Sequence, residues 1–251
     1  MEFKNLHQQN DPLLICNVWD VPSTKIAEKL NFQAIGTSSF AIAKMLGYED
    51  GEKLSFPELE YIVKRIAANT KLPLSVDLES GYSRDYLEIS DHIKRLAGLG
   101  VVGINIEDSI VDTERTFIEP EQFSKTLSLV RNQLEKDSIK IFINVRTDTF
   151  LLGHSNPVEE TKKRIKLYEN AGADGIFVPC VEKEPDIKAI VESTALPINV
   201  LCMPNLPNFD KLMKLGVKRI SMGNFIFDNM YKDFERMLNL VSVQKSFNSV
   251  F

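Results

Sequence analysis

Eight short apolar runs alternate with longer segments of helical periodicity along the chain. The runs are rich in β-branched residues, and this order is typical of parallel strands connected by helices. The expected strands span residues 14–19, 34–38, 74–79, 103–108, 141–148, 175–180, 198–202 and 219–223. Eight evenly spaced units in 251 residues predict one α/β domain over residues 1–251, a single (β/α)8 barrel of parallel strands. A doubly wound open sheet is the alternative.

Several connecting segments carry clear helix signals. Residues 56–69 and 86–99 place their apolar side chains on one stripe, which indicates amphipathic helices. Gly100, Gly172 and Gly216 suit the left-handed residue that ends a helix before the next strand. An extra C-terminal helix is expected over about residues 226–243.

Composition excludes several classes of protein. Thirty Lys and Arg against 35 Asp and Glu give a net charge of −5, and no basic stretch suggests a nucleic-acid partner. No run of about 18 apolar residues indicates a membrane span, and the polar start does not resemble a signal peptide, so a cytoplasmic location is expected. Cys16, Cys180 and Cys202 are widely spaced, which predicts reduced thiols and no structural zinc site.

Acidic side chains recur near the carboxyl ends of three consecutive strands, where barrel enzymes hold their chemistry. Period-two alternation places Asp77 and Glu79 on the inward face of one strand, and Glu107 on that of the next. The strand after these brings Arg146 and Asp148 to the same face.

Three carboxylates in a partly dehydrated barrel mouth repel one another unless a cation or bound protons compensate. Oxygen donors without histidine favour Mg²⁺, with Mn²⁺ as the alternative. The competing interpretation is that these acids cap helices or pair with Arg146 and nearby lysines. Arg146 itself either binds a substrate carboxylate or phosphate, or forms an internal ion pair with Asp148 or Glu107.

Other candidates carry weaker signals. The turn that contains Ser38, Ser39 and Phe40 can offer hydroxyls and backbone N–H groups to an anion, although serine also caps helices routinely. Asn199 is expected to line the pocket from the seventh strand. The three histidines, including His7 in the polar N-terminal segment, are expected on the surface.

Six phrases together carry a family resemblance. They are Asn17-Val18-Trp19-Asp20, Thr37-Ser38-Ser39, Leu46-Gly47-Tyr48-Glu49-Asp50-Gly51-Glu52, Val76-Asp77-Leu78-Glu79-Ser80-Gly81-Tyr82, Gly103-Ile104-Asn105-Ile106-Glu107-Asp108 and Asn144-Val145-Arg146-Thr147-Asp148. From about residue 14 to 224 the sequence resembles the isocitrate lyase / phosphoenolpyruvate mutase superfamily. The resemblance implies a Mg²⁺-dependent barrel that binds 2-oxo acids, passes through a pyruvate-like enolate and forms a homo-oligomer, a dimer or a tetramer.

The resemblance also implies roles for individual residues. Asp77 matches the direct metal ligand, while Asp50, Glu79 and Glu107 match carboxylates that hold the metal through its waters. Ser38, Ser39 and the amide of Phe40 match the loop that cradles the substrate carboxylate or phosphonate, and Arg146 matches an arginine that contacts the substrate. From the residues alone, Asp50 would be a solvated acid in a turn.

Departures from the family pattern narrow the activity. Residues 109–117 lack the cysteine of the isocitrate lyase loop, and Cys180 stands in a segment without the histidine of the mutases. A lyase or decarboxylase of a small 2-oxo dicarboxylate such as oxaloacetate is therefore expected, with Arg146, Tyr48 and Glu107 as catalytic residues. Proton donors could be Tyr48, Glu114, Arg115 or a metal-bound water. A phosphoenolpyruvate mutase or phosphonopyruvate hydrolase, and a metabolite-binding barrel without turnover, are the alternatives.

Overall fold

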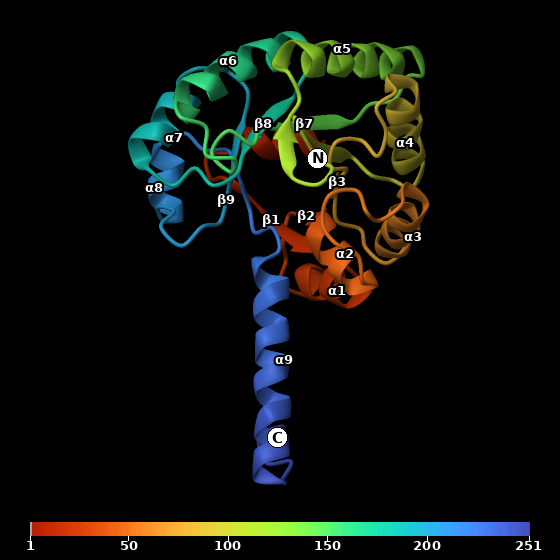
Figure 1. Ribbon diagram of the computed structural model, residues 1–251, viewed down its shortest axis with the longest axis vertical. Coiled ribbons are helices and arrows are strands. Elements are labelled where there is room, and N and C mark those ends of the chain that lie inside the picture. The colour runs from red at the N-terminus through yellow and green to blue at the C-terminus, as the bar shows by residue number, and fades with distance from the viewer. Residues whose placement is uncertain (1) are drawn as a thin grey trace.

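The computed structural model describes residues 2–251 and confirms the (β/α)8 barrel (Figure 1). The barrel strands are β1 (Leu13–Val18), β2 (Ala34–Thr37), β3 (Leu74–Asp77), β4 (Gly103–Glu107), β7 (Phe142–Arg146), β8 (Gly175–Val178), β9 (Ile198–Leu201) and β10 (Arg219–Ser221). All neighbouring pairs are parallel, and β10 pairs with β1 to close the barrel.

Side chains alternate between the two faces of each strand. In β4, Ile104 and Ile106 belong to the large apolar cluster that the strands share with the surrounding helices. Asn105 and Glu107 therefore point into the barrel, as the period of two predicts. The last inward residues of the strands meet at one mouth of the barrel.

The helices between the strands surround the barrel, one further helix precedes β1, and another follows β10 (Figure 1). They are η1 (Phe3–Gln8), α1 (Val21–Lys29), α2 (Ser39–Leu46), α3 (Phe56–Ala67), α4 (Tyr86–Gly98), α5 (Pro120–Lys136), α6 (Pro157–Asn170), α7 (Glu184–Val191), α8 (Phe209–Lys214) and α9 (Phe225–Gln244). Sequence punctuation explains their starts: at α3, for example, Ser55 and Glu58 form a capping box.

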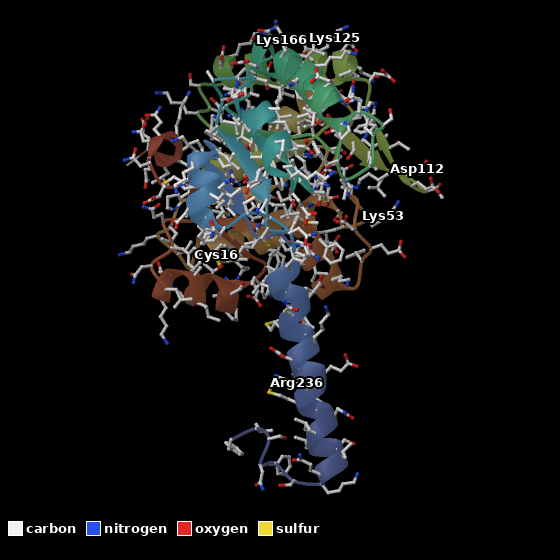
Figure 2. All side chains as sticks on the ribbon, turned by 90° about the vertical axis from the view of Figure 1, so that its left-hand side faces the viewer. Cys16, Lys53, Asp112, Lys125, Lys166 and Arg236 are labelled. Carbon is white, nitrogen blue, oxygen red and sulfur yellow. The ribbon has the colours of Figure 1, made fainter. Side chains whose placement is uncertain are left out.

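A short hairpin, which no periodicity in the sequence predicts, interrupts the alternation after β4. Its antiparallel strands are β5 (Ser109–Val111) and β6 (Arg115–Phe117). The hairpin lies against the loop after α2, because Lys53 Nζ donates to the Asp112 carbonyl at 3.2 Å. Figure 2 shows Lys53 and Asp112 near each other at the edge of the molecule.

The opposite end of the barrel is closed by η1. Phe3 and Leu6 pack with Phe142 and the first inward residues of β1 and β2 in a second apolar cluster. His7 stacks on the Phe142 ring with centroids 4.3 Å apart, and it is only 4% exposed. The prediction that His7 lies on the surface is therefore wrong, because the barrel end closes over a segment that reads as polar in sequence.

Helix α9 projects away from the barrel as a long arm (Figure 1). Large apolar side chains along it are exposed, among them Phe234 at 52% and Leu238 at 54%. Within residues 2–251, no helix combines the length and the apolar character that a membrane crossing requires.

Candidate active site

Asp77 ends β3 at the barrel mouth, and its carboxylate is held by the first residue of α2. The Ser39 hydroxyl donates to Asp77 Oδ2 at 2.7 Å, and the Ser39 amide donates to the same oxygen at 3.3 Å. Thr37 accepts a 2.8 Å hydrogen bond from the Asp77 amide. The Thr37–Ser39 turn thus fixes Asp77. Ser39 therefore positions this carboxylate, besides its predicted contact with a substrate.

Glu79 reaches the mouth through a turn and not through strand alternation. Strand β3 stops at Asp77, and Glu79 adopts a left-handed φ of 49° while remaining buried. Its carboxylate accepts 2.7 Å hydrogen bonds from the Glu52 amide and from the Tyr82 hydroxyl. Burial, with the nearby Asp50 and Asp77 carboxylates, raises the pKa of Glu79 to about 7.

Glu107 and Asp148 both bind the Arg146 guanidinium. Arg146 Nη1 lies 2.9 Å from Glu107 Oε2, and Arg146 Nε donates to Asp148 Oδ1 at 2.6 Å. Burial raises the pKa of Glu107, and the Arg146 charge opposes this rise. The internal ion pairs considered for Arg146 are thus present, and its contact with a substrate stays a prediction.

Arg115 of the hairpin is the second cation at the mouth. Its Nη1 pairs with Glu107 and donates to Ser109 Oγ at 3.0 Å, while its Nη2 donates to Asp50 Oδ2 at 3.0 Å. Asp148 Oδ2 lies 3.4 Å from Nη1. Arg115 therefore links the loop after α2 to the ends of β4 and β7, a role that its place in an irregular stretch of sequence did not reveal.

A buried network outside the barrel supports the ends of β4 and β7. Asp108 accepts hydrogen bonds from Thr147 Oγ1 and Tyr168 Oη, both at 2.7 Å, and pairs with Arg164 Nη1 at 2.9 Å. It also accepts from the Asp148 amide at 3.1 Å. Asp108 thus positions Asp148, a role that no local sequence signal predicts.

Other predicted site residues have different neighbours. The exposed Tyr48 donates through its hydroxyl to Glu58 Oε1 at 2.7 Å. The structure therefore does not bring this hydroxyl to the carboxylates of the barrel mouth. Ser38 caps α2 by accepting from the Ala41 amide at 3.3 Å.

Phe40 and Asn199, the two other predicted substrate-binding residues, lie at the rim of the barrel and inside it, respectively. Phe40 lies in the first turn of α2, with Lys44 over its ring. Asn199 is buried inside the barrel and donates to Ser221 Oγ at 3.0 Å.

The donor set fits a hydrated divalent cation. Asp50, Glu107 and Asp148 pair with the two guanidiniums, and Asp77 and Glu79 add two carboxylates without a cation among the described residues, so five ionised carboxylates leave a formal excess of three negative charges. Among residues 2–251, no three acidic, histidine or cysteine side chains form a ready set of direct ligands. Mg²⁺ needs no such set, because it usually keeps several waters and binds one or two carboxylates directly.

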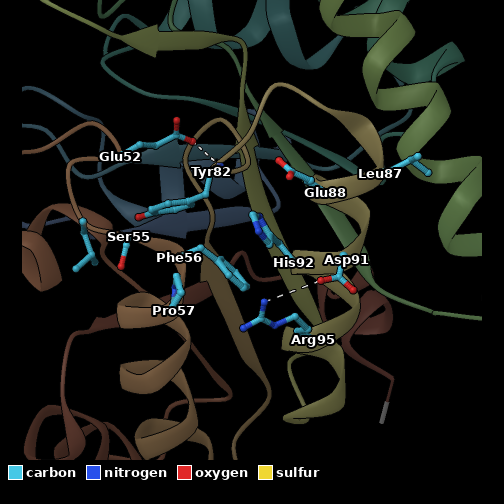
Figure 3. A pocket seen from close by; sticks show the side chains of 11 residues that line it. Glu52, Ser55, Phe56, Pro57, Tyr82, Leu87, Glu88, Asp91, His92 and Arg95 are labelled. Atoms are coloured by element: carbon cyan, nitrogen blue, oxygen red, sulfur yellow. Dashed lines mark hydrogen bonds and ion pairs between the residues drawn. The ribbon is translucent and has the colours of Figure 1, made fainter.

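A separate cavity of about 720 Å³ lies between α3 and α4 (Figure 3). Its wall includes Phe56 and His92, whose rings stack with centroids 3.8 Å apart, and Arg95, which lies over the Phe56 ring. Asp50, Asp77 and Glu107 do not line it. Tyr82, which donates to Glu79, is shared between this cavity and the barrel mouth.

Comparisons with known proteins agree with the fold. The sequence matches the phosphoenolpyruvate phosphomutase family over residues 3–242, so the chain belongs to that family. The chain is therefore an enzyme of this family. A 2,3-dimethylmalate lyase, described as a member of the PEP mutase/isocitrate lyase superfamily, shares its fold with a TM-score of 0.85 at 15% identity.

Three relatives place the chain more closely. "Uncharacterized protein Rv1998c" of Mycobacterium tuberculosis strain H37Rv is 33% identical over 224 residues, which cover 89% of this chain and 82% of the relative. An oxaloacetate decarboxylase of Pseudomonas entomophila strain L48 is 28% identical over 218 residues, covering 83% and 72%. A crystal structure from Burkholderia cenocepacia J2315, named only provisionally as a phosphonomutase, superposes with a TM-score of 0.89 at 30% identity, covering 94% of this chain and 97% of that one.

Proposed function

We propose that this protein is a Mg²⁺-dependent carbon–carbon lyase that cleaves a small 2-oxo dicarboxylate, with oxaloacetate as the first substrate to test. The observation that carries the proposal is the group of five carboxylates at the barrel mouth, which in formal charge, with all five ionised, exceeds Arg115 and Arg146 by three. Cleavage beyond C3 leaves an electron pair on the 2-oxo fragment, so the site must stabilise negative charge on its oxygens.

The relatives favour this reaction class. Oxaloacetate decarboxylases are 26–28% identical to this chain over 217–247 residues. Among proteins of the same fold, a phosphonopyruvate hydrolase was solved with oxalate and Mg²⁺. For this chain, the proposal of Mg²⁺ is based on the acidic residues at the mouth, all of which offer carboxylate oxygen.

The mechanism assigns separate tasks to the residues at the mouth. When bound, Mg²⁺ supplies a Lewis acid for the developing negative charge. Asp77 would hold it directly, and Asp50, Glu79 and Glu107 would hold its waters.

The remaining residues act on the substrate or on the proton. Ser38 and the Phe40 amide, at the positive end of α2, bind one substrate carboxylate, and Ser39 joins them once its hydroxyl releases Asp77. Arg146 orients the anion, because Glu107 and Asp148 fix its guanidinium plane. Tyr48 must release Glu58 before its hydroxyl can deliver a proton to the product.

The test is pyruvate formation from oxaloacetate, measured with Mg²⁺ and protein against a blank with Mg²⁺ alone. Asp77→Ala should lower the rate by about 10²–10³-fold, the usual effect of removing one main electrostatic contact. Asp11→Ala, which removes an exposed carboxylate before β1, is the matched control and should keep the full rate. Equal rates for the wild type and a folded Asp77→Ala variant would contradict the proposal.

A second candidate is phosphonopyruvate chemistry. A phosphoenolpyruvate phosphomutase of Tetrahymena pyriformis is 25% identical over 236 residues, covering 89% of this chain and 77% of the relative. Phosphorus NMR with phosphonopyruvate distinguishes the candidates: appearance of phosphoenolpyruvate or inorganic phosphate, with no turnover of oxaloacetate, would select this one.

We infer that the protein is a homo-oligomer in which α9 packs against a second copy. Ile226, Met230, Phe234 and Met237 repeat at helical spacing along this arm, with exposed fractions from 39% to 52%. Such a stripe is typical of a protein contact. Light scattering coupled to size exclusion should report a dimer or tetramer, and Phe234→Asp should lower the mass. A wild-type monomer would refute this inference.

A further inference from the structure

A buried arginine crosses the barrel interior beneath the carboxylates. Arg219 is the first residue of β10, is 2% exposed, and donates through Nη2 to Asn105 Oδ1 on β4 at 3.4 Å. Strands β10 and β4 lie opposite each other, with three strands between them on either side of the ring. The guanidinium therefore reaches the far wall, next to β3, which neighbours β4.

This guanidinium has too few partners for its charge. Within residues 2–251 no carboxylate lies at ion-pair distance from Arg219, and its Nε and Nη1 atoms have no hydrogen-bond acceptor. Burial lowers the pKa of Arg219 to about 10, so it remains a cation at neutral pH. A buried cation without a nearby anion costs several kcal/mol, and the Asp77 charge reaches it only at longer range.

A second orphan donor lies on the same side of the interior. Ser75 of β3 is 1% exposed, and its buried hydroxyl has no partner among the described residues. Ser75 pairs in register with Gly103 of β4, and Asn105, which accepts from Arg219, lies two residues further along the same strand. The Ser75 hydroxyl and the end of the Arg219 side chain therefore both lie at the inner face of β3 and β4.

Aromatic side chains close the barrel end next to these two donors. Phe3 lies against Gly103, and a Cβ there would meet the Phe3 ring at 2.8 Å and Ser75 Oγ at 3.2 Å. His7 contributes an orphan Nε2, but its Nδ1 lies 3.2 Å from the Phe3 carbonyl oxygen. Nδ1 must therefore carry the hydrogen, which leaves Nε2 as an acceptor that suits water and not an anion.

We propose that Arg219 and Ser75 bind one monovalent anion of halide size, chloride in ordinary buffers, inside the barrel below Asp77. Nη1 of Arg219, which has no partner among the described residues and lies on a different edge of the guanidinium from Nε–H, and the Ser75 hydroxyl supply the donors, and the anion supplies the missing charge. The near-complete burial of both side chains selects a small spherical anion over a carboxylate or a phosphate. The anion enters during folding or through local opening.

Bromide provides the direct test, and it does not depend on any activity. The protein is refolded and crystallised in sodium bromide, and anomalous differences are measured at the bromine edge. An anomalous peak between the Arg219 guanidinium and Ser75 Oγ is expected. Solvent density without an anomalous signal would identify ordered water only and would overturn the proposal.

Stability gives an independent readout. The Tm is compared after refolding in sodium chloride or sodium gluconate at one ionic strength, and it should rise by roughly 3–6 °C for each tenfold increase of chloride above Kd. Arg219→Met should abolish this response and Ser75→Ala should weaken it, whereas Arg65→Met, at an exposed position on α3, should retain it. No chloride response in the wild type, or an equal response in Arg219→Met, would refute the site. If Arg219→Met does not fold, Ser75→Ala and the crystal decide.

Discussion

Replacing Arg164 by methionine tests whether the network behind the barrel mouth holds its shape. Arg164 is 4% exposed and pairs with the fully buried Asp108, so the substitution leaves a buried carboxylate without its cation. Breaking one side of a buried ion pair costs about 3–5 kcal/mol. Thr147 and Tyr168 still donate hydrogen bonds to the Asp108 carboxylate in this variant, so the loss should not exceed this range. For a chain of this size the Tm should fall by roughly 6–20 °C.

Urea denaturation followed by circular dichroism measures the effect. Lys162→Met removes an exposed ion pair to Glu159 on the same helix, and it should change the free energy of unfolding by less than about 1 kcal/mol. Adding Asp108→Asn to Arg164→Met should recover part of the loss, because the unpaired charge is gone. The deficit should also shrink as the pH falls, since protonated Asp108 needs no cation. An Arg164→Met variant within about 1 kcal/mol of wild type at neutral pH would refute the reasoning.

Three further predictions follow from single contacts. Burial lowers the pKa of His7 to about 4, so its folded form resists protonation and stability is lost as the pH falls from about 6.5 towards 4. Relative to His7→Phe, which keeps a ring against Phe142, the free energy of unfolding of the wild type should fall by about 3 kcal/mol over this pH range, as measured by urea denaturation. A difference between the two proteins that does not change with pH would contradict the lowered pKa of His7. Gly51→Ala should destabilise the hairpin, because φ is +95° and the new Cβ would lie 2.4 Å from Val111 Cβ, and faster proteolysis within residues 109–117 would report it. Ser39→Ala removes the 2.7 Å hydrogen bond to Asp77, so Mn²⁺ should bind about tenfold more weakly by calorimetry, and unchanged affinity would show that Ser39 does not position this carboxylate.

The barrel could be predicted from sequence because its signals are local. Each strand repeats with a period of two, and the ends of parallel strands meet at one mouth whatever the helices do. Asp77 and Glu107 were found in this way. Glu79 was selected for the wrong reason, since it leaves the strand and reaches the mouth through a left-handed turn.

Long-range pairing explains what the sequence could not predict. Asp108 meets Arg164 across 56 positions of sequence, and Arg115 reaches Asp50 across 65. His7 becomes buried only when the opposite end of the barrel closes over Phe142. The β5–β6 hairpin has three residues in each strand, too few to show a period.

The two arginines at the mouth also set the thermodynamics of ligand capture. Arg146 and Arg115 already share Glu107, one on each of its oxygens. An incoming carboxylate must therefore exchange with an existing partner, so each new contact replaces one that the free protein already makes. We expect a small binding heat, with the affinity arising mainly from the water and ions released into bulk solution.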